Sequence, residues 1–290
     1  MTNRLDDTTS LQSRFPAELQ MTTIDGLSVR YAHTHALRDE AETLLLLSPW
    51  PESLMAFLPI WDRLTERYNV LALDLPGFGG SEGRADVIAP EAMGDFIDKA
   101  VRHFGLVRPH AVGPDVGTSA LLFAAANHPR SFSSITIGSG AVSFPLDVAS
   151  ALADLIAAPI EDLRAIVAED LIDDVLATML DYVVPQFVRQ DYIKSYQGER
   201  YAESARFVRR YPEELLILQT RLSDIQTPVL VIVGRKDPFV PVTNGHYLAD
   251  RIPNARLQII DAGHFVWEEA AEPYADHLLD WAATHKRGQR

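Results

Sequence analysis

The segment Pro109–Ala126 reads PHAVGPDVGTSALLFAAA, and it is the most informative stretch of the chain. Its apolar start predicts a short strand, and the small and apolar residues after position 117 predict a buried helix. The G-x-D-x-G pattern at residues 113–117 is typical of a sharp strand-to-helix turn that exposes its middle residue as a nucleophile. In most proteins with this pattern that residue is serine, and here it is Asp115. Taken alone, the pattern also fits an ordinary turn with a helix-capping aspartate.

Short apolar segments that end in turn residues recur on both sides of this turn. They predict six strands, at 43–48, 68–74, 110–113, 133–139, 228–234 and 256–261. Helical patterns lie between them, at 56–67, 90–104, 118–128, 244–251 and 270–285. Strand and helix in alternation predict an α/β fold, with a mainly parallel sheet covered by helices on both faces. Before them, the alternating residues 18–34 with Asp25-Gly26 at the centre predict an antiparallel hairpin.

One interval, residues 141–223, contains helical patterns but no convincing strand. Four prolines divide it into short helices. We expect these residues to form a helical cap, or lid, on a core domain made of residues 17–140 and 224–290. Residues 1–16 are polar and without periodicity, and we expect a loose N-terminal tail there. The cap carries five tyrosines, Tyr182, Tyr192, Tyr196, Tyr201 and Tyr211.

Two more chemically active residues follow late predicted strands. Asp237 comes three residues after Gly234, and His264 comes three residues after Asp261. Because the carboxyl ends of parallel strands meet at one edge of a sheet, Asp115, Asp237 and His264 are expected to lie together. Taken singly, Asp237 also fits an ordinary turn and His264 a polar loop.

With these motifs, the chain resembles the α/β-hydrolase superfamily from about residue 18 to residue 283. The resemblance rests on the Asp115 turn, the helical insertion, and the segments DLPGFGGSE (74–82), GRKDPFVP (234–241) and GHFVWEE (263–269). With an aspartate at this turn, the chain is similar to haloalkane dehalogenases, haloacid dehalogenases of this fold and epoxide hydrolases. The resemblance implies a catalytic triad with Asp115 as nucleophile, His264 as base and Asp237 as the acid that orients it. It implies no cofactor and no metal.

Aspartate suits such chemistry because a carboxylate that attacks saturated carbon forms an ester, which water can cleave, whereas a serine would leave a stable ether. Neutral His264 would then activate water to attack the ester carbonyl. Backbone N–H groups must stabilise the resulting oxyanion. The expected donors are Val116 and a residue of the loop after the first central strand, where Trp50 lies.

The chain departs from the family at both places. Residues 48–51 read Ser-Pro-Trp-Pro where H-G-x-P is usual, and Val116 stands where related enzymes carry tryptophan or arginine. Valine supplies no side-chain donor to a halide or a carboxylate. The Trp50 indole is either a donor to a leaving group or a buried packing residue.

Epoxide opening requires an acid, which in epoxide hydrolases is usually a pair of lid tyrosines. Tyr201 and Tyr211 lie nearest to the return of the cap to the core, so we favour them as proton donors. Three cap arginines, Arg206, Arg209 and Arg210, are either solvated or bind an anionic substrate. We therefore expect a hydrolase, in the first place an epoxide hydrolase, with haloalkane or haloacid dehalogenation as the alternative. Ester or carbon-carbon bond hydrolysis with Asp115 as base, and a noncatalytic ligand-binding protein, also stay open.

The amino-acid composition limits the kinds of partner that the protein is expected to bind. The 290 residues carry a formal net charge of −14, which disfavours nucleic acid and anionic membrane surfaces. There is no cysteine, which excludes disulfides and thiolate sites. No apolar run is long enough to span a bilayer and the first residues lack a signal-peptide pattern, so we expect a cytoplasmic protein. The expected partners are a small-molecule substrate and water, and the oligomeric state, homodimer included, stays open.

Overall fold

The computed structural model describes residues 15–36 and 41–286. Its centre is an eight-stranded sheet in the order β1-β2-β4-β3-β5-β6-β7-β8. The strands are β1 (Leu19–Ile24), β2 (Leu27–Thr34), β3 (Thr43–Leu47), β4 (Asn69–Leu73), β5 (His110–Pro114), β6 (Ser134–Gly138), β7 (Val229–Gly234) and β8 (Ala255–Ile260). From β4 to β8 all neighbours are parallel, and β2 runs antiparallel to both β1 and β4. The predicted α/β fold with a mainly parallel sheet is confirmed.

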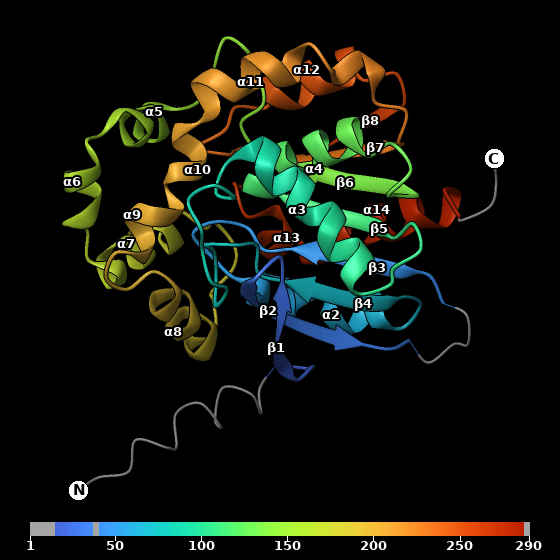
Figure 1. Ribbon diagram of the computed structural model, residues 1–290, viewed down its shortest axis with the longest axis horizontal. Coiled ribbons are helices and arrows are strands. Elements are labelled where there is room, and N and C mark those ends of the chain that lie inside the picture. The colour runs from blue at the N-terminus through green and yellow to red at the C-terminus, as the bar shows by residue number, and fades with distance from the viewer. Residues whose placement is uncertain (1–14, 37–40, 287–290) are drawn as a thin grey trace, which may run out of the picture.

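Helices cover both faces of this sheet (Figure 1). Helices α3 (Pro90–His103) and α4 (Val116–Asn127) lie in front of it, whereas α2 (Leu58–Thr65) and α14 (Ala271–Thr284) lie behind it. Helix α12 (Thr243–Arg251) packs on β7 and β8. Every residue of β5, β6 and β7 is buried, as the lack of alternation predicts for strands covered on both faces.

The hairpin β1–β2 forms where the sequence predicts it. Ile24 pairs with Leu27, so Asp25 and Gly26 alone make the turn. Both have positive φ, 52° and 78°, the backbone twist that favours Asp-Gly in a two-residue loop. The predicted tail lies mostly outside the described residues, but it does not reach Phe15, whose buried ring packs edge-on against Trp61 at 4.8 Å between centroids.

The chain between β6 and β7 is helical and lies at one end of the sheet (Figure 1). Its helices are α5 (Ser150–Ala157), α6 (Ile160–Arg164), α7 (Ala168–Leu176), α8 (Gln186–Ser195), α9 (Arg200–Ser204), α10 (Arg206–Arg209) and α11 (Tyr211–Gln219). Residues 161–184 contain no proline, yet the chain breaks between α6 and α7, and α7 ends at Leu176. Helices α8 to α10 lack a clear apolar period, and the sequence does not predict them individually. In the part of the chain that the structure describes, no helix is long and apolar enough to cross a membrane.

A buried ion cluster joins these cap helices to the sheet. The guanidinium of Arg30, in β2, binds Asp74 after β4 and both carboxylate oxygens of Asp191 in α8. Ser53 adds a 2.6 Å hydrogen bond to Asp191. The side chains of Asp74 and Asp191 are 0% and 7% exposed. Breaking such a buried pair leaves an uncompensated charge, so the cluster fixes the cap against the core.

Candidate active site

Asp115 sits on the sharp turn between β5 and α4 with φ 52° and ψ −120°, a strained conformation for a residue with a side chain. The turn is possible because its neighbours are small. A Cβ on Gly113 would lie 2.9 Å from the carbonyl oxygen of Gly117, and one on Gly140 would lie 2.3 Å from that of Asp115. Gly117 has room for a Cβ, so Gly113 and Gly140 are the glycines that this turn requires. The side chain of Asp115 is thereby raised above the sheet edge.

The structure brings Asp115, His264 and Asp237 together from three strand ends. Nδ1 of His264 lies 2.8 Å from Oδ2 of Asp237, and its Nε2 lies 3.7 Å from Oδ1 of Asp115. The other oxygen of Asp237 accepts hydrogen bonds from the N–H groups of Phe239 and Val240, at 2.8 and 2.9 Å. Asp237 is therefore held in place on both sides, and it fixes the ring of His264.

The charge state of His264 follows from these two carboxylates. Burial of the ring lowers its pKa, but Asp237 and Asp115 more than offset that effect and raise the pKa of His264 to about 10. In the free protein at neutral pH, His264 is therefore an imidazolium between two carboxylates. Removal of the negative charge on Asp115 would lower the pKa of His264.

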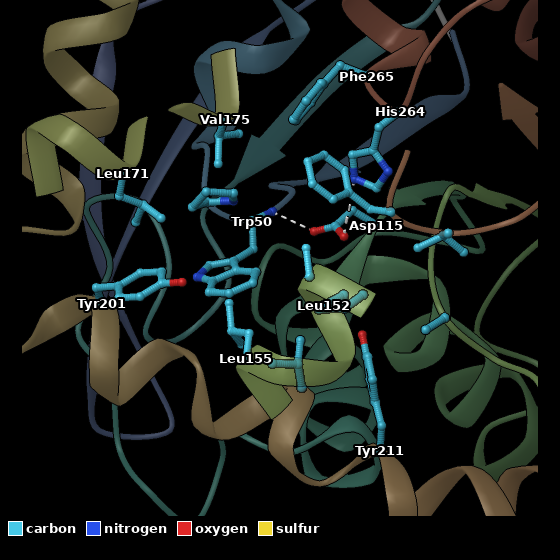
Figure 2. A pocket seen from close by; sticks show the side chains of 16 residues that line it. Trp50, Asp115, Leu152, Leu155, Leu171, Val175, Tyr201, Tyr211, His264 and Phe265 are labelled. Atoms are coloured by element: carbon cyan, nitrogen blue, oxygen red, sulfur yellow. Dashed lines mark hydrogen bonds and ion pairs between the residues drawn. The ribbon is translucent and has the colours of Figure 1, made fainter. Parts of the chain in front are cut away.

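The loop after β3 supplies a donor to Asp115. The backbone N–H of Trp50 donates to Oδ2 of Asp115 at 2.7 Å (Figure 2). The unusual sequence Ser48-Pro49-Trp50-Pro51 thus still places an N–H at the carboxylate. Val116 is the first residue of α4, so its N–H has no partner within the helix and is available beside Asp115.

The indole of Trp50 has another partner. Its Nε1 donates to Oγ of Ser204 at 2.8 Å, and its ring stacks on Tyr201 with 5.5 Å between centroids. This hydrogen bond engages the indole N–H that would otherwise be the donor to a leaving group. The interpretation as a buried packing tryptophan with a satisfied N–H fits the structure better.

Above Asp115 and His264 lies a cavity of about 150 Å³ (Figure 2). Its wall opposite the sheet comes from the cap and is aliphatic, with Leu152 and Leu155 of α5 and Leu171 and Val175 of α7. Among the described residues, no arginine or lysine lines it. Asp115 thus faces a cavity whose opposite wall is apolar.

The five cap tyrosines separate into groups. Tyr201 and Tyr211, the two favoured from the sequence, both line the cavity, and Tyr211 points toward Asp115 from the lower edge of Figure 2. Tyr192 and Tyr196 instead donate to Glu268 and to the carbonyl oxygen of Glu52. The remaining one, Tyr182, is not among the cavity-lining residues.

Both cavity tyrosines remain protonated at neutral pH. Burial raises the pKa of Tyr201. Burial and the charge of Asp115 raise the pKa of Tyr211, whereas a side-chain hydrogen bond with Ser119 counteracts the rise. Each hydroxyl is therefore a potential donor to the cavity, and Ser119 would stabilise the Tyr211 phenolate left by proton transfer.

The three cap arginines have protein partners. Arg206 pairs with Glu203, Arg210 pairs with Glu213 and Glu214, and Arg209 donates to the carbonyl oxygens of residues 156 and 158. None of them lines the cavity. Within residues 15–36 and 41–286, no group of three or more histidine, aspartate or glutamate side chains is arranged to hold a metal ion.

Two features of the site are not apparent in the sequence. Ser204 is the partner of the Trp50 indole, although the two are 154 positions apart. Glu269 accepts hydrogen bonds from the N–H groups of Gly263 and Phe265, both at 3.1 Å, and so shapes the loop that carries His264. The acidic pair at the end of GHFVWEE is the one signal in the sequence for the second feature.

Comparisons with known proteins agree with the observed fold. The family model described as alpha/beta hydrolase fold matches residues 42–271. A 2-hydroxy-6-oxononadienedioate/2-hydroxy-6-oxononatrienedioate hydrolase of Pseudomonas putida is 28% identical over 275 residues, which cover 86% of this chain and 90% of that protein. The solved epoxide hydrolase CorEH superposes with a TM-score of 0.77 at 19% identity, over 92% of this chain and 99% of its own. The solved enol-lactonase from Burkholderia xenovorans LB400 superposes with a TM-score of 0.76 at 19% identity, over 90% of this chain and 99% of its own.

Proposed function

The chain belongs to the α/β-hydrolase fold family, and on that premise we propose that it hydrolyses a small, neutral epoxide through a covalent ester on Asp115. One observation carries the proposal. Oδ2 of Asp115 accepts the Trp50 N–H at 2.7 Å, while Oδ1 faces His264. Oδ2 is thus already bound as the carbonyl oxygen of an ester must be, and Oδ1 is left to attack.

In the first step, Oδ1 of Asp115 attacks an epoxide carbon and the ring C–O bond breaks. The alkoxide takes a proton from a cavity tyrosine, and Tyr211 is the first candidate because it faces Asp115. Asp115 becomes neutral, so His264 loses one of the two carboxylates that raise its pKa. The imidazolium of His264 then gives its proton to the tyrosine phenolate. This leaves His264 neutral and ready to act as a base.

In the second step, His264 takes a proton from water, and the hydroxide adds to Cγ of the ester. The negative charge develops on Oδ2, where the Trp50 N–H donates. The Cγ–Oδ1 bond then breaks, so Oδ1 leaves in the diol and the water oxygen stays on Asp115. His264 protonates the leaving oxygen and afterwards takes up the proton of the new carboxylic acid, which restores the ion pair.

The cavity favours a neutral and small substrate. The cap wall is aliphatic and, in the described part of the chain, contributes no arginine or lysine that could bind a carboxylate. A protein cavity of about 150 Å³ accommodates a molecule about the size of benzene. Epoxides with a short alkyl substituent fit both limits, and styrene oxide, a benzene ring with two more carbons and an oxygen, lies at the upper end of this size range.

Dehalogenation has less support. A departing halide needs N–H donors, and Val116 provides no side-chain donor, while the Trp50 indole is bonded to Ser204. An epoxide needs a proton donor instead, and two tyrosines line the cavity.

A second candidate is carbon-carbon bond or ester hydrolysis with Asp115 as a base and no covalent ester. The Pseudomonas putida relative favours it, since that protein is named as a hydrolase of 2-hydroxy-6-oxo dicarboxylates. Among the described residues no arginine or lysine lines the cavity, and Asp115 and Asp237 already pair with the charge of His264. The cavity therefore does not suit a dicarboxylate, and this chain would act on a less charged substrate.

The test is an activity screen with purified protein over styrene oxide and short alkyl epoxides, matched haloalkanes and haloacids, simple esters and 2-hydroxy-6-oxo acids. We expect diol formation from the neutral epoxides, and its loss in Asp115→Asn. Turnover confined to the oxo acids or esters would transfer the assignment to the second candidate. Binding without turnover of any class would indicate a noncatalytic protein.

A further inference from the structure

Two buried glutamates beside the site have no part in the proposed reaction. Glu52 is 1% exposed and directly follows Pro51 in the loop that carries the Trp50 N–H. Glu268 is 3% exposed and lies in α13 (Val266–Glu269), the short helix that begins just after His264. The two carboxyl groups adjoin each other, close enough for a hydrogen bond between them when one of them is protonated.

The hydrogen bonds around the pair leave one donor missing. Oε2 of Glu52 accepts from Nε1 of Trp267 at 3.1 Å, and Oε1 of Glu268 accepts from the Tyr192 hydroxyl at 3.3 Å. The other two oxygens, Oε1 of Glu52 and Oε2 of Glu268, are buried and have no hydrogen-bond partner among the described residues. Two adjoining buried carboxylates would also repel each other. A single proton held between them supplies the donor and removes the repulsion.

The pair connects three parts of the site. The carbonyl oxygen of Glu52 accepts a 2.7 Å hydrogen bond from Tyr196, next to α8 of the cap, and Tyr192 of α8 reaches Glu268. The Trp267 ring, whose N–H binds Glu52, lies edge-on to His264 with 5.9 Å between centroids. The pair therefore joins the Trp50 loop to the loop and helix that carry His264.

We propose that Glu52 and Glu268 are positioning residues that share one proton and thereby hold the Trp50 N–H against Asp115. This proposal rests on the proposed function in one respect, which is that the Trp50 N–H serves as the donor to the Asp115 ester. We call the two residues the carboxyl clamp.

Protonation controls the carboxyl clamp. Burial, reinforced by Glu268, raises the pKa of Glu52 well above its ordinary value, and burial raises the pKa of Glu268 to about 7. As pH rises, the pair loses one of its two protons and then holds the other, until the second carboxyl group also ionises.

Other groups near the pair modify this order. His264 favours ionisation of Glu52, whereas Asp115 opposes it. The Tyr192 hydroxyl favours ionisation of Glu268 and Glu269 opposes it, and the Tyr182 phenol, close enough for both glutamates to raise its pKa, stays neutral. The second ionisation places two charges in one buried site. At alkaline pH the two carboxylates therefore repel each other, and the carboxyl clamp no longer holds the Trp50 N–H against Asp115.

Three variants separate positioning from bulk packing. Glu52→Gln copies the protonated acid, because its amide donates to Glu268 and its oxygen accepts from Trp267. Glu52→Ala removes both contacts. Glu272→Gln, on the exposed first turn of α14, is the matched control for loss of one glutamate charge.

The first measurement needs no substrate. It follows amide hydrogen exchange at the Trp50 N–H by NMR, and the thermal midpoint, from about pH 7 to pH 10. In wild type and Glu272→Gln we expect protection that falls as pH rises, beyond the base-catalysed exchange of a reference amide, together with a falling midpoint. Glu52→Gln should keep the protection, and its midpoint should fall less than that of wild type, because it retains only the alkaline loss of the His264 proton. Glu52→Ala should lose protection at least about tenfold already at neutral pH. Equal protection in Glu52→Ala and wild type, or the same alkaline loss in Glu52→Gln and wild type, would overturn the carboxyl clamp.

The second measurement is the rate of Asp115 alkylation by styrene oxide. We expect Glu52→Gln to stay within about twofold of wild type at pH 7 and Glu52→Ala to fall about tenfold or more. Absence of alkylation in wild type would refute the proposed function, whereas the exchange data would still decide on the carboxyl clamp. Normal alkylation by Glu52→Ala would refute the clamp alone.

Discussion

Nε2 of His264 lies 3.7 Å from Oδ1 of Asp115, while its Nδ1 lies 2.8 Å from Oδ2 of Asp237. Both carboxylates hold a proton on the ring, although a general base must be without one. Formation of the proposed ester removes the charge on Asp115, and so converts His264 into a base at the stage where water must be activated.

This relationship predicts different pH profiles for the two chemical steps. With the pKa of His264 at about 10 in the free protein, alkylation should not change with His264 titration at neutral pH. In the ester the pKa is lower, and hydrolysis should slow as pH falls through that lower value and the ring takes up a proton. Rapid-quench measurement of ester formation and decay at a series of pH values checks both steps. Ester decay that is independent of pH on the acid side would show that His264 is not the base.

Replacement of the base should trap the intermediate. In His264→Gln we expect alkylation to continue and hydrolysis to slow by roughly 10²-fold or more, since general base catalysis is lost. Mass spectrometry of the Asp115 peptide should then show an increase equal to the mass of the epoxide. Asp115→Asn, treated in the same way, should show no adduct, and an adduct on any other residue would contradict the assignment.

The cavity tyrosines should control the first step. Tyr211→Phe should slow alkylation by an epoxide by roughly 10²-fold, the usual effect of losing a general acid, and Tyr201→Phe should have an equal or smaller effect. The control is Tyr247→Phe in α12, whose hydroxyl binds Gln219 and which does not line the cavity. Burst kinetics of the alkyl-enzyme give the rates. Wild-type rates in both cavity variants would leave the alkoxide without its proposed acid.

The Trp50 indole should matter for stability more than for chemistry. Trp50→Phe leaves the backbone N–H in place and removes the hydrogen bond to Ser204, which should cost on the order of 1 kcal/mol of unfolding free energy. Epoxide alkylation should change only a few-fold. Denaturant unfolding and burst kinetics on the same samples test this. A large loss of rate on a haloalkane, with no tyrosine dependence on any epoxide, would favour dehalogenation.

Much of the fold is accessible from sequence because buried parallel strands are short, continuously apolar and bounded by turn residues. All six expected strands of the parallel part are present, with ends that differ by at most one residue. Asp115, Asp237 and His264 could be associated because the carboxyl ends of parallel strands converge.

Other features depend on three-dimensional packing that no local pattern encodes. Helices α8 to α10 show no clear apolar period, since their buried residues face several different surfaces. The partner of the Trp50 indole is 154 positions away, and Trp267 is 215 positions from Glu52. Neither pair has a fixed spacing or a motif that a single sequence could reveal.

The most direct test of the covalent mechanism is a single turnover of a neutral epoxide in ¹⁸O-labelled water with protein in excess. If Oδ1 attacks carbon and water attacks Cγ, the first diol contains an oxygen from Asp115, and the heavy oxygen appears in the Asp115 peptide. We predict label in Asp115 and unlabelled product from that first turnover. Heavy oxygen in the first product, with none in Asp115, would contradict the covalent mechanism.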